Sequence, residues 1–135
     1  MIKLNAATKS AGQCVAMVPD VCKTPPANTP LPYPNMSLLA TCTGTVKKVL
    51  IVHKECVVEG SKMLRSSLDE PGITGGIVSG VNMNQVAPIQ FSSTVIAQGK
   101  KMVYLTCKTK HNGSNANVMM GMVATPSQMK VLIGM

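Results

Sequence analysis

Two apolar runs dominate the hydrophobic pattern of the chain, and each is followed by a reversal and a returning segment. Residues 46–52 are rich in β-branched side chains and predict a strand with at least one buried face. Residues 56–58 are expected to return antiparallel to it after a short turn. Residues 91–97 predict a second strand, and Gln98-Gly99 predicts the tight turn that leads into a returning strand over 100–105. Helix signals are absent nearly throughout, so the pattern predicts an all-β protein.

The other segments are shorter or ambiguous. Residues 1–14 are small and polar and predict an irregular N-terminal segment ahead of one domain over 15–135. Residues 15–18 fit a short strand, whereas 36–42 fit either a helical turn or a strand. Residues 60–80 are predicted to form a series of turns, and residues 107–115 a loop. Residues 125–134 are predicted to form a strand without a return partner.

A proline-rich stretch is the strongest local signal. Five prolines fall within residues 25–35, so the backbone there is stiff, extended and poor in hydrogen-bond donors. Such a tract is more typical of a linker or of a ligand for a partner, but its surroundings favour a structural corner. The triplet Cys-Lys-Thr at 22–24 recurs at 107–109, and each copy leads to a run that ends in Val-Leu-Ile. This recurrence indicates an internal repeat.

Three units can be drawn from this recurrence, over 22–51, 69–96 and 107–133. Each begins with a turn-rich corner, passes a proline and closes on a β run. One such unit cannot bury its own apolar face, whereas three units packed around an axis can. The chain is therefore predicted to form a small conical domain of three pseudo-symmetric β repeats.

The composition and charge of the chain indicate that it binds a partner. Hydrophobic residues make up 45% of the 135, but with one Phe, two Tyr and no Trp the core must be aliphatic, with the 11 Met as gap-fillers. Only 13% of residues are charged, where about 25% is usual, which indicates that part of the surface is covered by a partner. The net charge of +8 suits an acidic protein surface. A basic nucleic-acid-binding β domain is kept as an alternative, although scattered lysines, a single arginine and few aromatic side chains disfavour it.

The cysteines and the N-terminus bear on the compartment. The five cysteines form an odd set without a secretory signal ahead of them, so reduced thiols in the cytoplasm are expected. No apolar run approaches the roughly 20 residues that span a bilayer. A chain that is made in the cytoplasm without a signal peptide is therefore expected.

Two stretches give the chain a resemblance to a known family. Residues 19–25, read together with 30–35, resemble the N-terminal signature of PAAR-like domains, the spike-tip proteins of type VI secretion and related contractile injection systems. Residues 94–100 resemble the T-V-x-I-N-G-K strand and turn of the main PAAR family, and 107–113 fall where that family has a D-x-T-x-H-G-G loop. Residues 101–104 depart from the family, because Lys-Met-Val-Tyr stands where Pro-Ala-Ala-Arg gives the family its name.

The resemblance implies a zinc site, because the tip of the main family holds zinc with histidine and cysteine ligands. Cys107 and His111 are spaced so that both could reach one ion, and Cys22, which the repeat places as the equivalent of Cys107, could supply a third ligand. Unit two offers Asp69 at the matching place. The competing interpretation is that both cysteines are small buried hydrophobes and that His111 is a loop residue that binds water. His53, at a predicted turn, is expected to be exposed.

Catalysis has little support in the residues. The acidic residues show no acid–base pairing, and a thiol hydrolase that uses Cys107 and His111 lacks an orienting group and an oxyanion donor. A small metal- or thiol-dependent hydrolase is therefore only an alternative. Residues 119–135 are rich in methionine and fit either core filler or an adaptable apolar base against a spike trimer or an effector chaperone.

The resemblance thus implies a non-enzymatic spike-tip protein. Its implied partners are a trimeric spike protein, with one copy of this chain per trimer, and effector or adaptor proteins, and the tip would contact a target membrane mechanically without binding nucleic acid. The chain would be made in the bacterial cytoplasm and exported on the spike. A fused effector is not expected, because only a short segment flanks the repeats.

Overall fold

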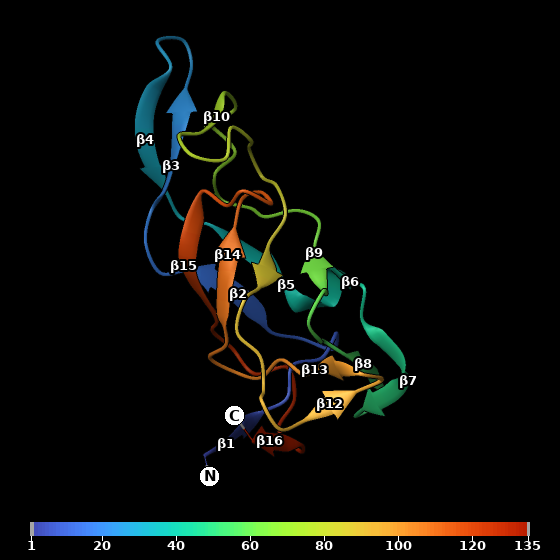
Figure 1. Cartoon of the computed structure of the whole chain (residues 1–135). Coiled ribbons are helices and arrows are strands. Elements are labelled where there is room, and N and C mark those ends of the chain that lie inside the picture. Colours follow the sequence, from blue (N-terminus) through green and yellow to red (C-terminus); the bar gives the residue numbers. More distant parts are fainter. Residues whose placement is uncertain (1, 135) are drawn as a thin grey trace.

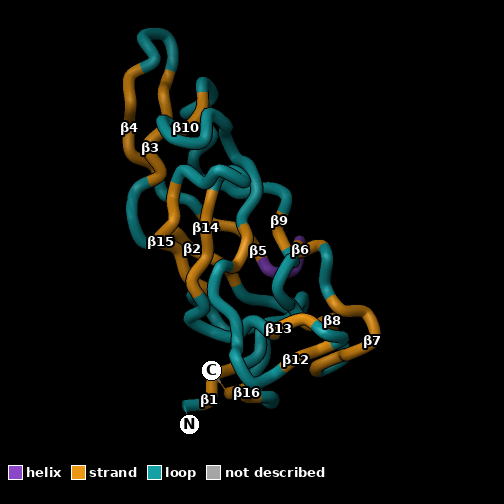
Figure 2. Tube along the Cα trace, viewed as in Figure 1, coloured by secondary structure: helices purple, strands orange, loops and turns teal. Residues whose placement is uncertain are grey.

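The computed structural model describes residues 2–134 and is built almost entirely of short strands and turns (Figure 2). The elements in chain order are β1 (Lys3–Asn5), β2 (Gln13–Ala16), β3 (Asp20–Thr24), β4 (Thr29–Tyr33), β5 (Met36–Leu38), the 3₁₀ turn η1 (Leu39–Thr41), β6 (Cys42–Thr43), β7 (Val46–Ile51), β8 (Lys54–Cys56), β9 (Lys62–Met63), β10 (Gly75–Gly76), β11 (Ala87–Pro88), β12 (Ile96–Ala97), β13 (Lys100–Lys101), β14 (Lys108–His111), β15 (Val118–Val123) and β16 (Leu132–Gly134). The predicted all-β class is confirmed. The ambiguous segment 36–42 contains both a strand and a helical turn. Among the described residues, no helix is long and apolar enough to cross a membrane.

The strands are arranged in a tapering body (Figure 1). The hairpin of β3 and β4 forms the narrow end, with β10 beside it. Strands β1, β7, β8, β12, β13 and β16 lie together at the broad end. The first and last strands, β1 and β16, therefore lie side by side at the broad end, whereas the narrow end is built from the β3–β4 hairpin.

The broad end has approximate threefold symmetry in its backbone hydrogen bonds. Three segments, 5–9, 55–59 and 101–105, bond to one another in a closed cycle. The Val57 N–H donates to the Ala7 carbonyl (2.9 Å), the Val103 N–H donates to the Val57 carbonyl (3.0 Å), and the Ala7 N–H donates to the Val103 carbonyl (2.9 Å). A second cycle runs in the opposite sense: Lys9 N–H donates to Glu55 C=O, Glu59 N–H to Lys101 C=O and Leu105 N–H to Asn5 C=O. Because each segment bonds to both of the others at equivalent positions, the three segments surround one axis.

Each ring segment is preceded by an outer strand, and the three outer strands are equivalent as well. Leu50 pairs with Glu55 in β7–β8, Ile96 pairs with Lys101 in β12–β13, and Leu132 pairs with Asn5 in β16–β1. The Val-Leu-Ile runs noted in the sequence therefore occupy matching places, which confirms the prediction that each unit closes on a β run. In β7–β8 and β12–β13 the strands are joined by tight turns, at Val52-His53 and at Gln98-Gly99, all four residues having positive φ.

The third outer strand corrects two expectations. Residues 125–134 were expected to lack a return partner, but β16 pairs antiparallel with β1 over three residues. The N-terminal segment 1–14, predicted to be irregular, thus supplies β1, and its residues Ala6, Ala7 and Thr8 are fully or almost fully buried. The first residues of the described chain complete the ring because they supply the third ring segment.

A five-stranded sheet in the order β11-β14-β15-β2-β5 forms the middle of the body. Residues 107–115 were expected to be a loop, but Lys108–His111 forms β14 within this sheet, paired with β11 and β15. The apolar run at 118–123 is β15, which pairs with β14 on one side and β2 on the other. Of the predicted strand 91–97, only Ile96 and Ala97 pair as β12.

The proline tract forms one arm of the narrow-end hairpin. In β4, Pro30 lies opposite Lys23 and Pro32 lies opposite Val21. Strand β4 is an edge strand of the sheet β10-β3-β4, where a residue without an N–H leaves no ladder bond unmade. The tract is therefore a structural corner and not a linker, as its surroundings had indicated.

The core is aliphatic and centred on the ring. Its largest buried side chains include Tyr104, Met63 and Leu39, packed with alanines from the ring segment 5–9 and with valines from the other two ring segments and the outer strands. Four of the five cysteines belong to it; Cys22 does not. The narrow half, in contrast, buries mostly polar side chains, and these form the candidate site.

Candidate functional site

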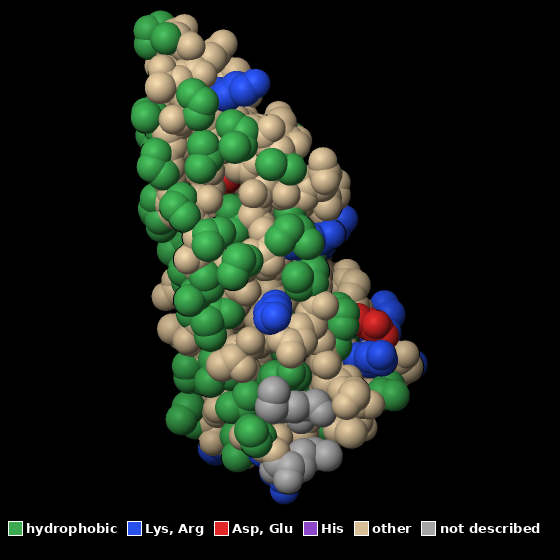
Figure 3. Space-filling model, turned by 60° about the vertical axis from the view of Figure 1, so that its left-hand side comes forward, with side chains coloured by type: hydrophobic (Ala, Val, Ile, Leu, Met, Phe, Trp, Pro, Cys, Tyr) green, Lys and Arg blue, Asp and Glu red, His purple; other side chains and the backbone are tan. Residues whose placement is uncertain are grey.

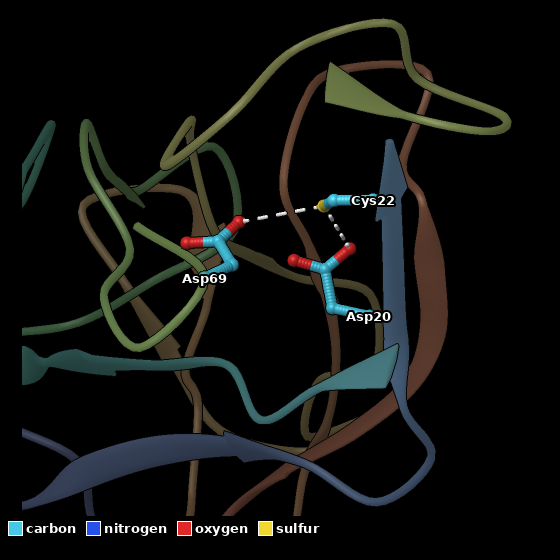
Figure 4. A group of neighbouring side chains, drawn as sticks. All are labelled: Asp20, Cys22 and Asp69. Carbon is cyan, nitrogen blue, oxygen red and sulfur yellow. Dashed lines mark hydrogen bonds between the residues drawn. The ribbon is translucent and has the colours of Figure 1, made fainter. Parts of the chain in front are cut away.

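Two carboxylates and a thiol meet in the interior below the narrow-end hairpin (Figure 4). Asp20 and Cys22 lie two residues apart on β3 and project from the same face, because side chains alternate along a strand. Asp69 comes from the turn-rich segment between β9 and β10. The Cys22 thiol donates to Asp20 Oδ1 (3.5 Å) and lies 4.0 Å from Asp69 Oδ2. One potential ligand atom of each residue lies within 4.8 Å of the others, and all three side chains are buried.

Asp20 is surrounded by amide donors. Asn35 Nδ2 donates to its Oδ2 (3.0 Å), and Asn112 Nδ2 donates to its Oδ1 (3.2 Å). Asn117 Nδ2 makes a further, short contact with Oδ1. The same Asn112 amide also points at the Cys22 sulfur, at 3.7 Å. Four hydrogen-bond donors, the Cys22 thiol included, thus surround the Asp20 carboxylate, and none of them is a cation.

Asp69 is less well satisfied. Its Oδ2 accepts from the Met83 N–H (3.2 Å), but its buried Oδ1 has no partner within the described part of the chain. Burial, together with the neighbouring Asp20, raises the pKa of Asp69 to about 7. The turn that carries Asp69 approaches β3 closely at Gly72, where any Cβ would collide with the Cβ of Cys22. The glycine therefore brings the second carboxylate against the thiol.

His111 lies behind this group and not in it. Its Nδ1 is 2.8 Å from Asn35 Oδ1, which can only accept, so Nδ1 carries the proton and Nε2 accepts from the Thr109 hydroxyl at 2.9 Å. Both ring nitrogens are therefore engaged. Burial lowers the pKa of His111 to about 4. The ring lies over Gly121, where a Cβ would collide with it. The interpretation of His111 as a water-binding loop residue is wrong, because the ring is fully buried.

Cys107 is far from the other predicted ligands. It lies in the aliphatic core, where its sulfur accepts from the Tyr104 N–H at 3.3 Å. Four residues of nearly extended chain place its Cα roughly 12 Å from that of His111. Burial raises the pKa of the Cys107 thiol to about 11 and that of Cys22 to about 12.

The structure therefore does not bring Cys22, Cys107 and His111 together. The predicted repeat equivalence of Cys22 and Cys107 is also wrong. Cys107 donates its N–H to the Tyr104 carbonyl just as Ser61 does to Val58, so Ser61 is its counterpart around the axis. Cys107 behaves as the small buried hydrophobe of the competing interpretation, whereas Cys22 belongs to the polar cluster. His53 is exposed as predicted.

Sequence reasoning missed the amides. Asn35 lies between β4 and β5, and Asn112 and Asn117 lie in the connection between β14 and β15; no sequence spacing links them to Asp20. Asp20 and Cys22 share a face because they lie two residues apart on β3, but the sequence had predicted a turn at Asp20 and not a strand. Asp69 had been noted only as the place of a missing ligand, and the structure makes it a central member.

A second candidate surface lies at the broad end. Leu50, Ile96 and Leu132 occupy equivalent register positions in the three outer strands and are 56%, 59% and 52% exposed. Exposed aliphatic side chains are ordinary when they occur singly. Three of them, repeated around one axis, form a triangular set of exposed apolar side chains at the broad end.

Comparison with known proteins agrees with this architecture. Residues 13–133 match the family described as the Toxin PAAR-like domain. The chain belongs to this family. It is 32% identical over 110 residues to the DNase toxin Tse7 of Pseudomonas aeruginosa, an alignment that covers 75% of this chain. The PAAR-like chain matches about 28% of that relative's length. No solved structure gives a significant match.

Proposed function

We propose that this PAAR-like chain caps the trimeric spike of a contractile injection machine of the type VI class, one copy on each trimer. The observation that carries the proposal is the threefold set of Leu50, Ile96 and Leu132 on the outer strands that pair with the hydrogen-bonded ring of the broad end. A single chain with approximate threefold symmetry can offer the same contact to each of three identical spike chains. The tapering body and the edge-strand prolines would then give the assembly a stiff point that meets a target membrane mechanically.

The proposal includes transport but not catalysis. The chain would be made in the bacterial cytoplasm, leave on the spike and carry effector or adaptor proteins with it; the similarity to a DNase toxin supports this connection. The hydrolase alternative needed Cys107 beside His111, and the two lie in different surroundings. Raised thiol pKa values also leave little thiolate for nucleophilic chemistry.

The docking proposal is tested with the cognate spike trimer by size-exclusion chromatography with light scattering and by binding titration. We expect one copy per trimer, and a loss of affinity of roughly tenfold for each of Leu50→Lys, Ile96→Lys and Leu132→Lys, because the three positions are equivalent. Leu31→Lys, at an exposed position of the narrow-end hairpin, is the matched control and should bind normally. Three copies per trimer, or normal binding by the triple variant, would refute the proposal.

We also propose that Asp20, Cys22 and Asp69 hold a zinc ion, in place of the predicted set of Cys22, Cys107 and His111. Two buried carboxylates share one cluster, Asp69 Oδ1 has no partner, and a thiol lies between them, so the donors fit a divalent cation that accepts oxygen and sulfur. Bound zinc would supply positive charge to the cluster and tie β3 to the turn at Asp69.

Metal content and a spectroscopic signature test the zinc proposal. The purified chain should contain about one zinc per molecule, and cobalt substitution should give thiolate-to-cobalt absorption. That absorption should disappear in Cys22→Ala and persist in Cys107→Ala, since only Cys22 belongs to the cluster. Cobalt–thiolate absorption that depends on Cys107, or a wild-type chain that takes up no metal, would contradict this assignment.

A further inference from the structure

A methionine-rich groove runs across the side of the middle sheet. It has a volume of about 510 Å³ and is lined by Met17, Ile89, Thr106, Lys108, Met119, Met120, Gly121 and Met122. Figure 3 shows hydrophobic side chains gathered along the side of the molecule that carries β4 and β15. This groove is separate from the ring at the broad end and from the buried cluster.

The register of the sheet explains why these side chains face outward. Met122 lies opposite Lys108 on β14 and Val15 on β2, and none of the three is buried. The next position, Val123 opposite Cys14, points into the core and is buried. Alternation along the strands thus places Met120 and Met122 on an uncovered face of the sheet. A bulge gives β15 one extra residue between Val118 and Gly121, so Met119 is exposed as well.

The uncovered face is unusually apolar for a surface. Met17, Met119 and Met120 are 61%, 54% and 62% exposed. Flexible thioether side chains adapt to a partner's shape, and methionine is over-used on surfaces that bind varied apolar partners. Contiguous exposed apolar residues mark interaction sites more often than scattered ones.

The backbone of the groove determines how a partner can bind. Strand β15 is hydrogen bonded to β14 on one side and to β2 on the other, so it has no free edge for an added strand. A partner must therefore bind through side chains, as an amphipathic helix does when it places its apolar face in a groove. The hollow shape suits a convex helix and not a flat bilayer surface.

The charge of the groove determines what should flank that helix. Among the described residues that line the groove, Lys108 alone is charged, and Lys110 lies two residues further along β14. A net charge of +8 opposes the approach of a second copy of this chain. We infer that the groove binds an amphipathic α-helix of another protein, with acidic residues along the border that faces β14. The groove lies away from the ring, so a helix and a spike could be held at the same time.

Synthetic helices test this inference on the full chain. The probe is an amphipathic peptide of about 18 residues with a leucine face and a glutamate border; a peptide with lysine at the border and a scrambled peptide of identical composition are its counterparts. We expect calorimetric binding of the glutamate peptide, weaker binding of the lysine peptide and none of the scrambled one. The ¹³C-methyl signals of Met17, Met120 and Met122 should shift on binding.

Variants of the chain locate the binding. Met120→Gln should weaken binding of the glutamate peptide roughly tenfold, whereas Met129→Gln, at a residue that is 75% exposed outside the groove, should not. Lys108→Glu should reverse the preference between the two peptide borders. The inference is overturned if the scrambled peptide binds with the same affinity as the glutamate peptide, or if none of the peptides binds. It is also overturned if Met120→Gln and Met129→Gln change the affinity for the glutamate peptide equally. Binding of anionic phospholipid vesicles without peptide binding, or self-association of the chain, would assign the groove to a membrane or to a second copy.

Discussion

The two ends of this PAAR-like domain are built on opposite chemical principles. The broad end is aliphatic and repetitive: three equivalent segments bond in a cycle, and their outer strands pair in the same register. The narrow half has no such repetition, and it buries carboxylates, amides, a thiol and an imidazole in one connected group. The stability of the broad end therefore depends on having apolar side chains of suitable size at the core positions. The stability of the narrow half depends on individual hydrogen-bond donors and acceptors.

This difference predicts different responses to mutation and to pH. An aliphatic core is indifferent to protonation and loses stability in proportion to the volume removed. A buried polar group responds to each missing partner and to any change of charge. The tests below separate the two ends on these grounds.

The largest effect is expected from the core around the ring. Tyr104→Ala should lower the free energy of unfolding by about 3–5 kcal/mol, because the large buried ring leaves a cavity that its surroundings cannot fill. Denaturant unfolding measures this loss. Leu31→Ala, at the partly exposed narrow-end hairpin, should change stability by only about 0.5 kcal/mol. Equal losses in the two variants would show that the ends are not distinct.

The next effect is a pH dependence that arises only in the narrow half. The pKa of His111 is about 4 in the folded chain and about 6.5 when unfolded, so the unfolded state binds more protons between these values. The stability that neutral His111 supports is thus present above pH 6.5 and is lost as the pH falls toward 4, by about 3 kcal/mol.

Asp69 has the opposite sign in nearly the same window. Its raised pKa favours folding below its usual range near 3.8, and this contribution is lost as the pH rises toward about 7. The two contributions offset each other in the metal-free wild type. The difference in unfolding free energy between wild type and His111→Gln, measured from pH 4 to 8 with chelator present, isolates the histidine. A pH-independent difference would contradict the buried neutral imidazole.

A smaller loss is expected when the link between His111 and the carboxylates is cut. Asn35 bonds to His111, Asp20 and Ser66, so Asn35→Ala should cost about 1–3 kcal/mol by leaving buried groups unpaired. Asn115→Ala, at an exposed position, is the matched control and should be nearly neutral. Thermal unfolding of both variants gives the comparison. A neutral Asn35→Ala would mean that water replaces the amide without cost.

The sequence predicted the broad end better than the narrow half, for a physical reason. The β runs that end at Ile51, Ile96 and Ile133 are recognisable from the local sequence pattern. This pattern was enough to predict three repeated units, each ending in a strand, packed around one axis. The missing third partner, β1, pairs with residues more than a hundred positions away, and its short polar sequence gives no sign of this.

The narrow-half cluster was harder because it is assembled from single residues. The repeat of Cys-Lys-Thr was a local coincidence: Cys22 lies in the polar cluster and Cys107 in the aliphatic core. Local spacing therefore suggested a ligand pair, Cys107 and His111, that extended backbone keeps apart. The amides of Asn35 and Asn112 converge only through tertiary structure, which no spacing encodes.

The pairing of β1 with β16 also sets an order on biosynthesis. Two of the three outer strand pairs are joined by tight turns and can form as soon as they emerge from the ribosome, but the third joins two strands that are more than a hundred residues apart. Until Leu132–Gly134 has been synthesised, the strand Lys3–Asn5 has no β16 to pair with. The ring and its outer strands are thus completed only when β16 is available to pair with β1, so a nascent chain that stalls before β16 would leave β1 unpaired.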